Sequence, residues 1–177
     1  MSINAFKASL VGGGARPNQF RVRLALPSFI AGGAVASKNG EFLCEATSLP
    51  GSSIGVAPAY YRGRVVPFAG ERTFQPWTVT IVNDTTFDIY NALEQWVHYM
   101  NHVSENTGET RPLNYTSDMG VDHLDRNGIK IKDYNFISAF PTEVSPISLA
   151  FNDNDNIERF TATFQYSYWT TASLGNK

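Results

Sequence analysis

The sequence contains a single cysteine, Cys44, among its 177 residues. One cysteine excludes an internal disulfide and a metal site built from several thiolates. Free cysteine is among the residues most often buried, so we expect Cys44 to be a small apolar core residue. The chain also has no long hydrophobic run, and its first residues form no sustained apolar segment. We therefore expect no membrane anchor and a protein that is made in a cytoplasm.

Charge is scarce as well. Asp, Glu, Lys and Arg make up only 17% of the residues, the net charge is -2, and no run of Lys or Arg occurs. A nucleic-acid-binding protein needs a basic surface that replaces the counterions around phosphates, so the composition argues against that class. A weakly charged surface suits a protein that covers much of itself with partners.

Hydrophobic and aromatic residues are plentiful. Hydrophobic residues reach 42% and aromatic residues 13%, which predicts a folded chain and favours β structure, where rings fit a pleated surface. The length suits one domain over residues 1–177. We expect an N-terminal arm over residues 1–17, which ends in a glycine-rich stretch, and a small, polar C-terminal tail over residues 170–177.

Alternating apolar and polar residues predict about seven strands. They cover residues 18–26, 41–48, 60–68, 78–83, 128–136, 147–151 and 157–169, the last being the longest. Residues 27–40 are small and glycine-rich, residues 52–59 have no firm pattern, and residues 104–127 are polar, so we expect loops there. The fold class that follows is mainly β: a β-sandwich or barrel of antiparallel strands with extended loops.

One helix is predicted, over about residues 86–101. Its apolar residues recur at helical spacing, which gives it a face that must pack on the sheets. That face consists of Phe87, Tyr90, Leu93, Trp96, Val97 and Met100. The preceding Thr85-Thr86-Phe87-Asp88 has the form of a capping box, with Asp in place of the preferred Glu.

Three segments contain residue types that occur in catalytic or metal sites. Gly51-Ser52-Ser53-Ile54-Gly55 matches the nucleophile elbow of hydrolases, but no helix follows it and the chain lacks alternating strands and helices. Glu94, His98 and His102 share one side of the helix without the zinc-peptidase spacing. Asp153, Asp155 and Glu158 lack the calcium-loop pattern. We therefore expect no catalytic residue, no metal and no cofactor.

Several segments together resemble the tail tube proteins of contractile-tailed bacteriophages. Their order and spacing carry the resemblance through most of the chain. The segments are Gly14-Ala15-Arg16-Pro17-Asn18 with Phe20; Cys44 with Ala46-Thr47 and Leu49-Pro50; Gly70 with Arg72-Thr73-Phe74; Trp77-Thr78-Val79-Thr80; Asn83-Asp84; the helix with Trp96; and Phe140-Pro141-Thr142 followed by residues 160–169. Residues 27–40 and 104–118 look longer than the family pattern, and their role is open.

The resemblance implies a structural subunit of the virion that is assembled in the host cytoplasm. Six-membered rings would stack into a hollow tube inside a contractile sheath, and DNA would pass through the tube. The implied partners are further copies of the chain, the sheath, the baseplate or tube-initiation proteins, and the tail terminator. The loop over about residues 47–61 would cross ring or subunit boundaries. Its candidate contact residues are Leu49, Pro50, Gly51, Ser52, Ser53, Ile54, Gly55, Tyr60 and Tyr61.

The same resemblance places the helix outside, toward the sheath. The candidate sheath-facing residues are Asp88, Asn91, Glu94 and His98. A conduit for DNA should not hold phosphates, so we expect its wall to be neutral or acidic. The uncharged face Thr161, Thr163, Gln165 and Ser167 would suit that wall, whereas the face with Arg21 and Arg23 would lie away from the channel.

Three other functions remain open at this point. The chain could be the tube subunit of a pyocin-like or type VI secretion particle, which genome neighbours would distinguish. It could be a hydrolase that uses Ser53, or a monomeric β-sandwich that binds a ligand. Electron microscopy would separate the last of these from a protein that forms rings.

Overall fold

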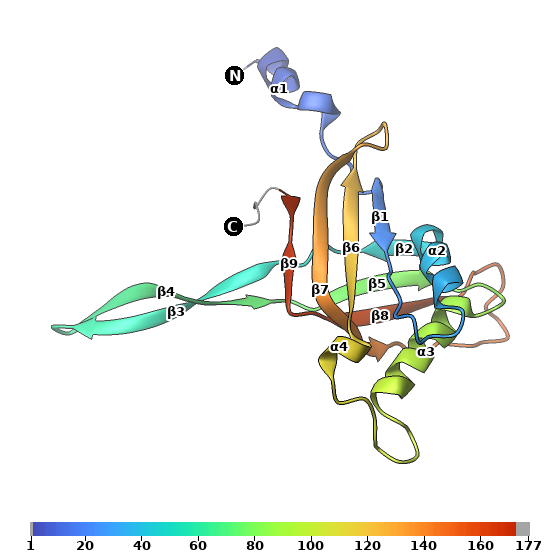
Figure 1. Ribbon diagram of the computed structural model, residues 1–177. Coiled ribbons are helices and arrows are strands. Elements are labelled where there is room, and N and C mark those ends of the chain that lie inside the picture. Colours follow the sequence, from blue (N-terminus) through green and yellow to red (C-terminus); the bar gives the residue numbers. More distant parts are fainter. Residues whose placement is uncertain (1, 173–177) are drawn as a thin grey trace.

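Residues 2–172 are described by a computed structural model, in which a seven-stranded antiparallel sheet folds over on itself. One part of the sheet has the order β1-β6-β7-β9, and the other has the order β7-β8-β5-β2. The strands are β1 (Phe20–Arg23), β2 (Cys44–Thr47), β5 (Trp77–Val82), β6 (Ser117–Leu124), β7 (Lys130–Val144), β8 (Arg159–Gln165) and β9 (Tyr168–Thr170). Figure 1 shows β1, β6, β7 and β9 crossing β2, β5 and β8 steeply. The mainly β, antiparallel fold class is confirmed.

Strand β7 belongs to both parts of the sheet and bends between them. Its residues 135–137 pair with β9, whereas Phe140 and Pro141 pair with β8. Between these segments Ser138 has a φ of 55°, a left-handed conformation that costs a non-glycine residue energy. The Ser138 N–H donates to Asp118 Oδ1 at 2.9 Å, which holds the bend in place.

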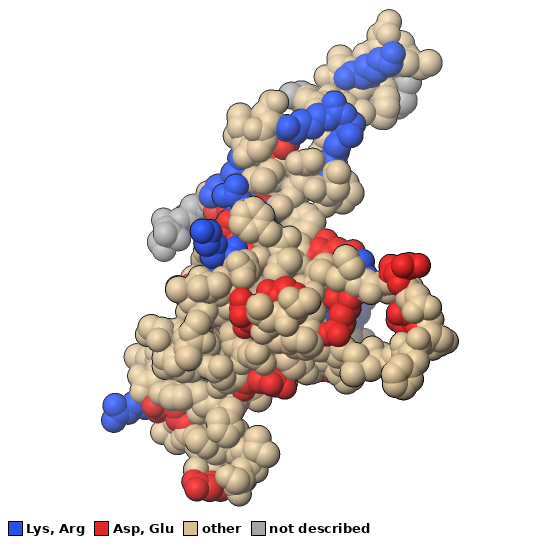
Figure 2. Space-filling model, turned by 90° about the vertical axis from the view of Figure 1, so that its right-hand side faces the viewer, with Lys and Arg blue, Asp and Glu red and all other residues tan. Residues whose placement is uncertain are grey.

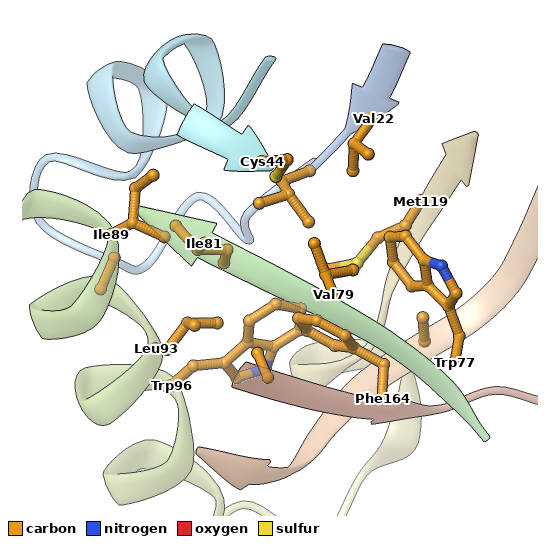
Figure 3. Packing of buried hydrophobic residues seen from close by; sticks show 14 of the residues in the cluster. Val22, Cys44, Trp77, Val79, Ile81, Ile89, Leu93, Trp96, Met119 and Phe164 are labelled. Atoms are coloured by element: carbon orange, nitrogen blue, oxygen red, sulfur yellow. The ribbon is translucent and has the colours of Figure 1, made fainter. Parts of the chain in front are cut away.

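The core lies between the two crossing parts of the sheet. Trp77, Val79 and Ile81 on β5 and Phe160, Ala162 and Phe164 on β8 are buried, as their alternation predicts. The rings of Trp77 and Phe136 stack with centroids 4.6 Å apart, so the two parts meet through aromatic side chains. Figure 3 shows Val22, Val79, Met119 and Phe164 converging on this region.

The predicted strand over residues 157–169 is divided. Strand β8 ends at Gln165, the Ser167 N–H bonds to the Ile137 carbonyl at 3.0 Å, and β9 then pairs with the first half of β7. Phe160, Ala162, Phe164 and Tyr166 alternate along this segment and share its buried face. Tyr168 does not, because it lies beyond the break and is 47% exposed.

Helix α3 (Asp88–Met100) covers one end of the core with Ile89, Leu93 and Trp96. The predicted helix is therefore confirmed, but its predicted capping box is wrong. Phe87 at the N-cap is left-handed (φ 57°) and provides no side-chain cap. Asp84 Oδ1 accepts the Asp88 N–H at 3.3 Å instead, because the turn that precedes the helix brings this carboxylate back over its first residue.

A second helix, α2 (Gly33–Leu43), replaces most of the loop predicted over residues 27–40 and shortens the strand predicted over residues 41–48. It packs on α3 and β1. Gly40 lies so close to Leu24, the residue that follows β1, that a Cβ there would be 2.8 Å from Leu24 Cδ1. The prediction failed because glycine favours loops in general, whereas here its small size permits close contact between the helix and Leu24.

The long loop predicted over residues 104–127 is also partly wrong, since it contains the short helix α4 (Pro112–Tyr115) and strand β6. Met119, Gly120 and Val121 are consecutively buried, so β6 does not alternate. Conversely, residues 147–151 form no strand; Leu149 and Phe151 are exposed there. Strand β7 extends well beyond the predicted residues 128–136.

Two elements project from this body. The N-terminal arm carries α1 (Ile3–Ser9), which has no buried residue, followed by a 3-10 turn, η1 (Val11–Gly13). Strands β3 (Ser52–Tyr61) and β4 (Arg64–Phe74) form a separate antiparallel hairpin. In Figure 1 the arm and the hairpin leave the body in different directions. Of the tail predicted over residues 170–177, Thr170 ends β9 and residues 173–177 lie outside the described residues.

Candidate assembly surfaces

The β3–β4 hairpin is exposed over nearly its whole length. The pattern predicts a loop over residues 52–59 and a strand over residues 60–68, but Ser52–Tyr61 is one strand, paired along its length with β4, and the turn between them falls inside the predicted strand. The prediction missed it because side chains of both faces are apolar or small, so no alternation marks a buried side. Ser52, Ser53, Ile54, Gly55, Tyr60 and Tyr61 lie on this strand, whereas Leu49, Pro50 and Gly51 lead into it.

Apolar side chains cover the hairpin on both faces. Tyr60 is 77% exposed and Phe68 is 58% exposed. The exposed apolar residues are Ile54, Val56, Tyr60, Tyr61, Val65, Val66 and Phe68. A two-stranded hairpin is marginal in water without a surface to pack on, and a contiguous exposed apolar patch marks an interaction site. The exposed apolar hairpin therefore has the character of an interaction surface.

Prolines limit how the hairpin can be covered. Pro58 on β3 lies directly opposite Pro67 on β4. Neither residue has an N–H to donate, so a further strand that paired along either edge would lack a hydrogen bond at its middle. The hairpin is thus better suited to contact through its two faces than through continuous strand addition.

A second surface lies on the side of β5 and β8 that faces away from the core. Thr78 pairs with Thr163, and Thr80 pairs with Thr161, so hydroxyl side chains are opposite one another across two strands. Gln165 continues this side, and all five residues are half-buried. We call Thr78, Thr80, Thr161, Thr163 and Gln165 the threonine face. Ser167 is exposed but lies after the end of β8.

The threonine face is bordered by one ion pair. Glu45 on β2 and Arg159 on β8 are hydrogen-bonded across the intervening strand β5, with Arg159 Nη2 3.2 Å from Glu45 Oε1 and Arg159 Nε bonded to Glu45 Oε2. The hydrogen bond from Arg159 lowers the pKa of the Glu45 carboxyl, and the bond from Glu45 raises the pKa of Arg159. Both groups are therefore charged at neutral pH and neutralise each other.

The arginines of β1 belong to a different surface. Arg23 bonds to Asn135 Oδ1 at 2.6 Å and lies 3.3 Å from Asp122 Oδ2, so it is paired within the part of the sheet that contains β1, β6 and β7. Arg21 on the same strand is exposed. Figure 2 shows Lys and Arg gathered toward the end of the molecule that carries the N-terminal arm, and Asp and Glu spread over the body.

The outer side of α3 forms a third surface. Asn91, Glu94 and His98 are exposed there, whereas Asp88 is half-buried and lies 3.5 Å from the Asn39 side chain of α2. A groove of about 600 Å³ runs between α3 and the end of β7. It is lined by Tyr90, Glu94, Gln95, Val97, His98, Val103, Thr142, Glu143 and Val144.

The segments weighed for chemistry are dispersed. Ser53 lies on the projecting hairpin, with its Oγ 2.7 Å from Thr73 Oγ1, and neither β3 nor β4 contains a histidine. The rings of His98 and His102 are 4.2 Å apart, but residues 2–172 contain no group of three or more His, Cys, Asp or Glu residues that could hold a metal. Burial raises the pKa of the Cys44 thiol to about 12, so it remains protonated.

No helix among the described residues is both long enough and apolar enough to cross a membrane.

Comparison with known proteins gives one consistent family. A family model described as phage tail tube protein matches residues 15–172. The tail tube protein of Serratia phage KSP90 is 28% identical over 167 residues, which cover 93% of this chain and 94% of that protein. Tail tube protein gp19 of Enterobacteria phage T4 is 28% identical over 156 residues, which cover 88% of this chain and 90% of that protein.

The fold is also found in a solved assembly. A chain in the extended sheath–tube complex of an extracellular contractile injection system superimposes with a TM-score of 0.60, covering 97% of both chains at 15% identity. At that identity the likeness concerns the fold alone.

Proposed function

We propose, because this chain belongs to the phage tail tube protein family, that its copies form six-membered rings which stack into the hollow tube of a contractile tail. The chain is thus a structural component of the virion. In the proposed assembly the rings stack, and DNA passes through the tube that they form. The observation that carries it is the β3–β4 hairpin, whose apolar faces project from the body without a partner in the same chain.

The hairpin supplies the contact between subunits. Its exposed side chains would be covered by the neighbouring subunit or by the next ring, and the residues that lead into it, Leu49, Pro50 and Gly51, set its exit from β2. Covering an apolar area of this kind stabilises an assembly by roughly 25 cal/mol per Å². A contact between two different patches of the same chain closes into rings or extends into stacks, which is the geometry a tube needs.

The threonine face provides the wall of the channel. Thr161, Thr163 and Gln165 are joined there by Thr78 and Thr80 of the neighbouring strand, while Ser167 lies at the end of the wall. Hydroxyl and amide groups offer no net charge, so DNA phosphates would pass them without being held. Arg21 and Arg23 belong to the other part of the sheet and lie away from the channel.

Helix α3 faces the sheath. Its inner side is committed to the core through Leu93 and Trp96, which leaves Asn91, Glu94 and His98 on the outside, with Asp88 at its start. The baseplate or tube-initiation proteins and the tail terminator would contact the two ends of the stack. In this role the protein makes and breaks no covalent bond.

Electron microscopy of the concentrated purified protein tests the proposal. Rings or tubes with the hairpin in the contact between subunits are expected. A protein that remains a monomer at every concentration and salt condition, and that is missing from purified virions, would show that the hairpin serves another purpose.

A further inference from the structure

We propose that Glu45 acts as a built-in counterion that keeps Arg159 from binding DNA on the threonine face. The inference rests on the proposed channel wall and adds a specific role for two residues on it. Strands β2, β5 and β8, all of which the structure describes, contain only two charged side chains, and these are Glu45 and Arg159. Within these three strands the two charges neutralise each other, because the side chains bind each other.

The geometry leaves Arg159 without a free nitrogen. Its Nε and Nη2 donate to the two carboxylate oxygens of Glu45, and its Nη1 donates to the Ile157 carbonyl at 2.9 Å. A guanidinium also recognises a phosphate by this bidentate arrangement of hydrogen bonds. Glu45 therefore occupies the positions on Arg159 that a phosphate would otherwise take.

Stability does not account for the pair. Arg159 and Glu45 are 46% and 44% exposed, and ion pairs at that exposure contribute little to folding. They come from strands that are separated by β5 and lie far apart in sequence. An exposed pair that links two strands across a third, at the border of the threonine face, is better explained by the charge it removes.

Assembly into a ring would multiply the effect of an unpaired Arg159 on DNA binding. One unpaired arginine on a monomer would bind DNA weakly, but a ring would present one from every subunit around the same channel. Each phosphate contact steepens the dependence of log affinity on log salt concentration by about 0.9 for duplex DNA. Loss of the Glu45 carboxylate in every subunit would therefore place a ring of unpaired Arg159 side chains along the channel wall.

The test compares Glu45→Gln, Arg159→Gln, the double variant and the wild type as assembled protein. Binding of a short fluorescent DNA duplex is measured by anisotropy across a salt series. We expect Glu45→Gln to bind at least about tenfold more tightly than wild type at low salt, with a steeper salt dependence. Arg159→Gln and the double variant should bind no more tightly than wild type. A purely structural pair would make the two single variants behave alike.

Thr161→Arg is the matched control, because it places an unpaired cation on the threonine face itself. If Thr161→Arg raises DNA binding and Glu45→Gln does not, the wall is placed correctly but the counterion role is wrong. If neither variant changes binding although tubes form, the threonine face does not line the channel. If Glu45→Gln fails to assemble while the double variant assembles, the pair serves assembly, which overturns the proposal as well. Absence of rings in the wild type would instead refute the proposed function.

Discussion

The indole Nε1 of Trp96 donates a hydrogen bond to the backbone carbonyl of Tyr115 at 2.6 Å. Trp96 lies on α3 and Tyr115 ends α4, so this bond fastens the segment that leads into β6 to the helix that covers the core. The Trp96 side chain is fully buried and lies against the ring of Phe164, with centroids 6.4 Å apart. One side chain thus joins the helix, the sheet and the connection between them.

Replacing Trp96 should separate these contributions. Trp96→Ala removes a buried ring and should lower the free energy of unfolding by about 3–5 kcal/mol. Trp96→Phe keeps most of the packing but leaves the Tyr115 carbonyl without its donor, which should cost about 1–3 kcal/mol. Chemical denaturation of both variants measures the difference. A negligible loss in Trp96→Ala would mean that α3 does not pack on the sheet as described.

The start of α3 depends on Asp84 and not on the predicted threonine cap. Asp84→Ala removes the oxygen that accepts the Asp88 N–H and should destabilise the protein by about 1 kcal/mol. Thr85→Ala is the matched control, because Thr85 is exposed and lies next to Asp84 in the same turn; it should have almost no effect. Equal losses in thermal melts of the two variants would contradict this cap.

Removing the hairpin should abolish assembly and spare the fold. Ser53 and Thr73 are directly opposite each other near its base, so residues 54–72 can be replaced by an Asn-Gly turn that joins the two strands. The shortened protein should remain folded by circular dichroism and sediment as a monomer.

Ser53→Ala retains the hairpin and serves as its control. It should assemble as the wild type does, and no hydrolytic activity should depend on this hydroxyl. A shortened protein that still formed tubes would show that the hairpin is not the contact between subunits.

Cys44 should resist thiol reagents while the protein is folded. Burial raises its pKa to about 12, whereas an exposed thiol titrates at about 8.5, so at pH 8 the native side chain is protonated and shielded. The stability that comes from keeping it protonated is complete below the unfolded pKa and is lost as pH rises toward the folded one. Labelling with iodoacetamide at pH 8, with and without denaturant, measures the protection; equally fast labelling under both conditions would refute it.

Local pattern predicted the parts of the fold in which a strand or helix has one buried side. The alternation over residues 78–83 placed Val79 and Ile81 in the core, and the helical spacing over residues 86–101 placed Leu93 and Trp96 there. The same kind of pattern did not predict α2, where Gly40 makes a close contact with Leu24. It also failed for β3, where both faces are exposed and no side is marked by burial.

The sequence predicted some parts of the candidate assembly surfaces and missed others. Thr161, Thr163 and Gln165 follow from the alternation of one strand, but their continuation through Thr78 and Thr80 depends on strand pairing. No signal in the sequence joins Glu45 to Arg159, because they lie on different strands far apart in the chain. The groove beside α3 likewise depends on where β7 ends relative to the helix.

The sequence by itself determined that this is a weakly charged, aromatic-rich β protein, and which side of its regular strands and main helix is buried. Those properties are local, since the period of apolar residues is set by the geometry of each element. Only the tertiary structure decided the bend of β7 at Ser138, the projection of an unsupported hairpin and the pairing of Glu45 with Arg159. Each of these arises where residues distant in the chain meet, and such meetings depend on how the elements pack together.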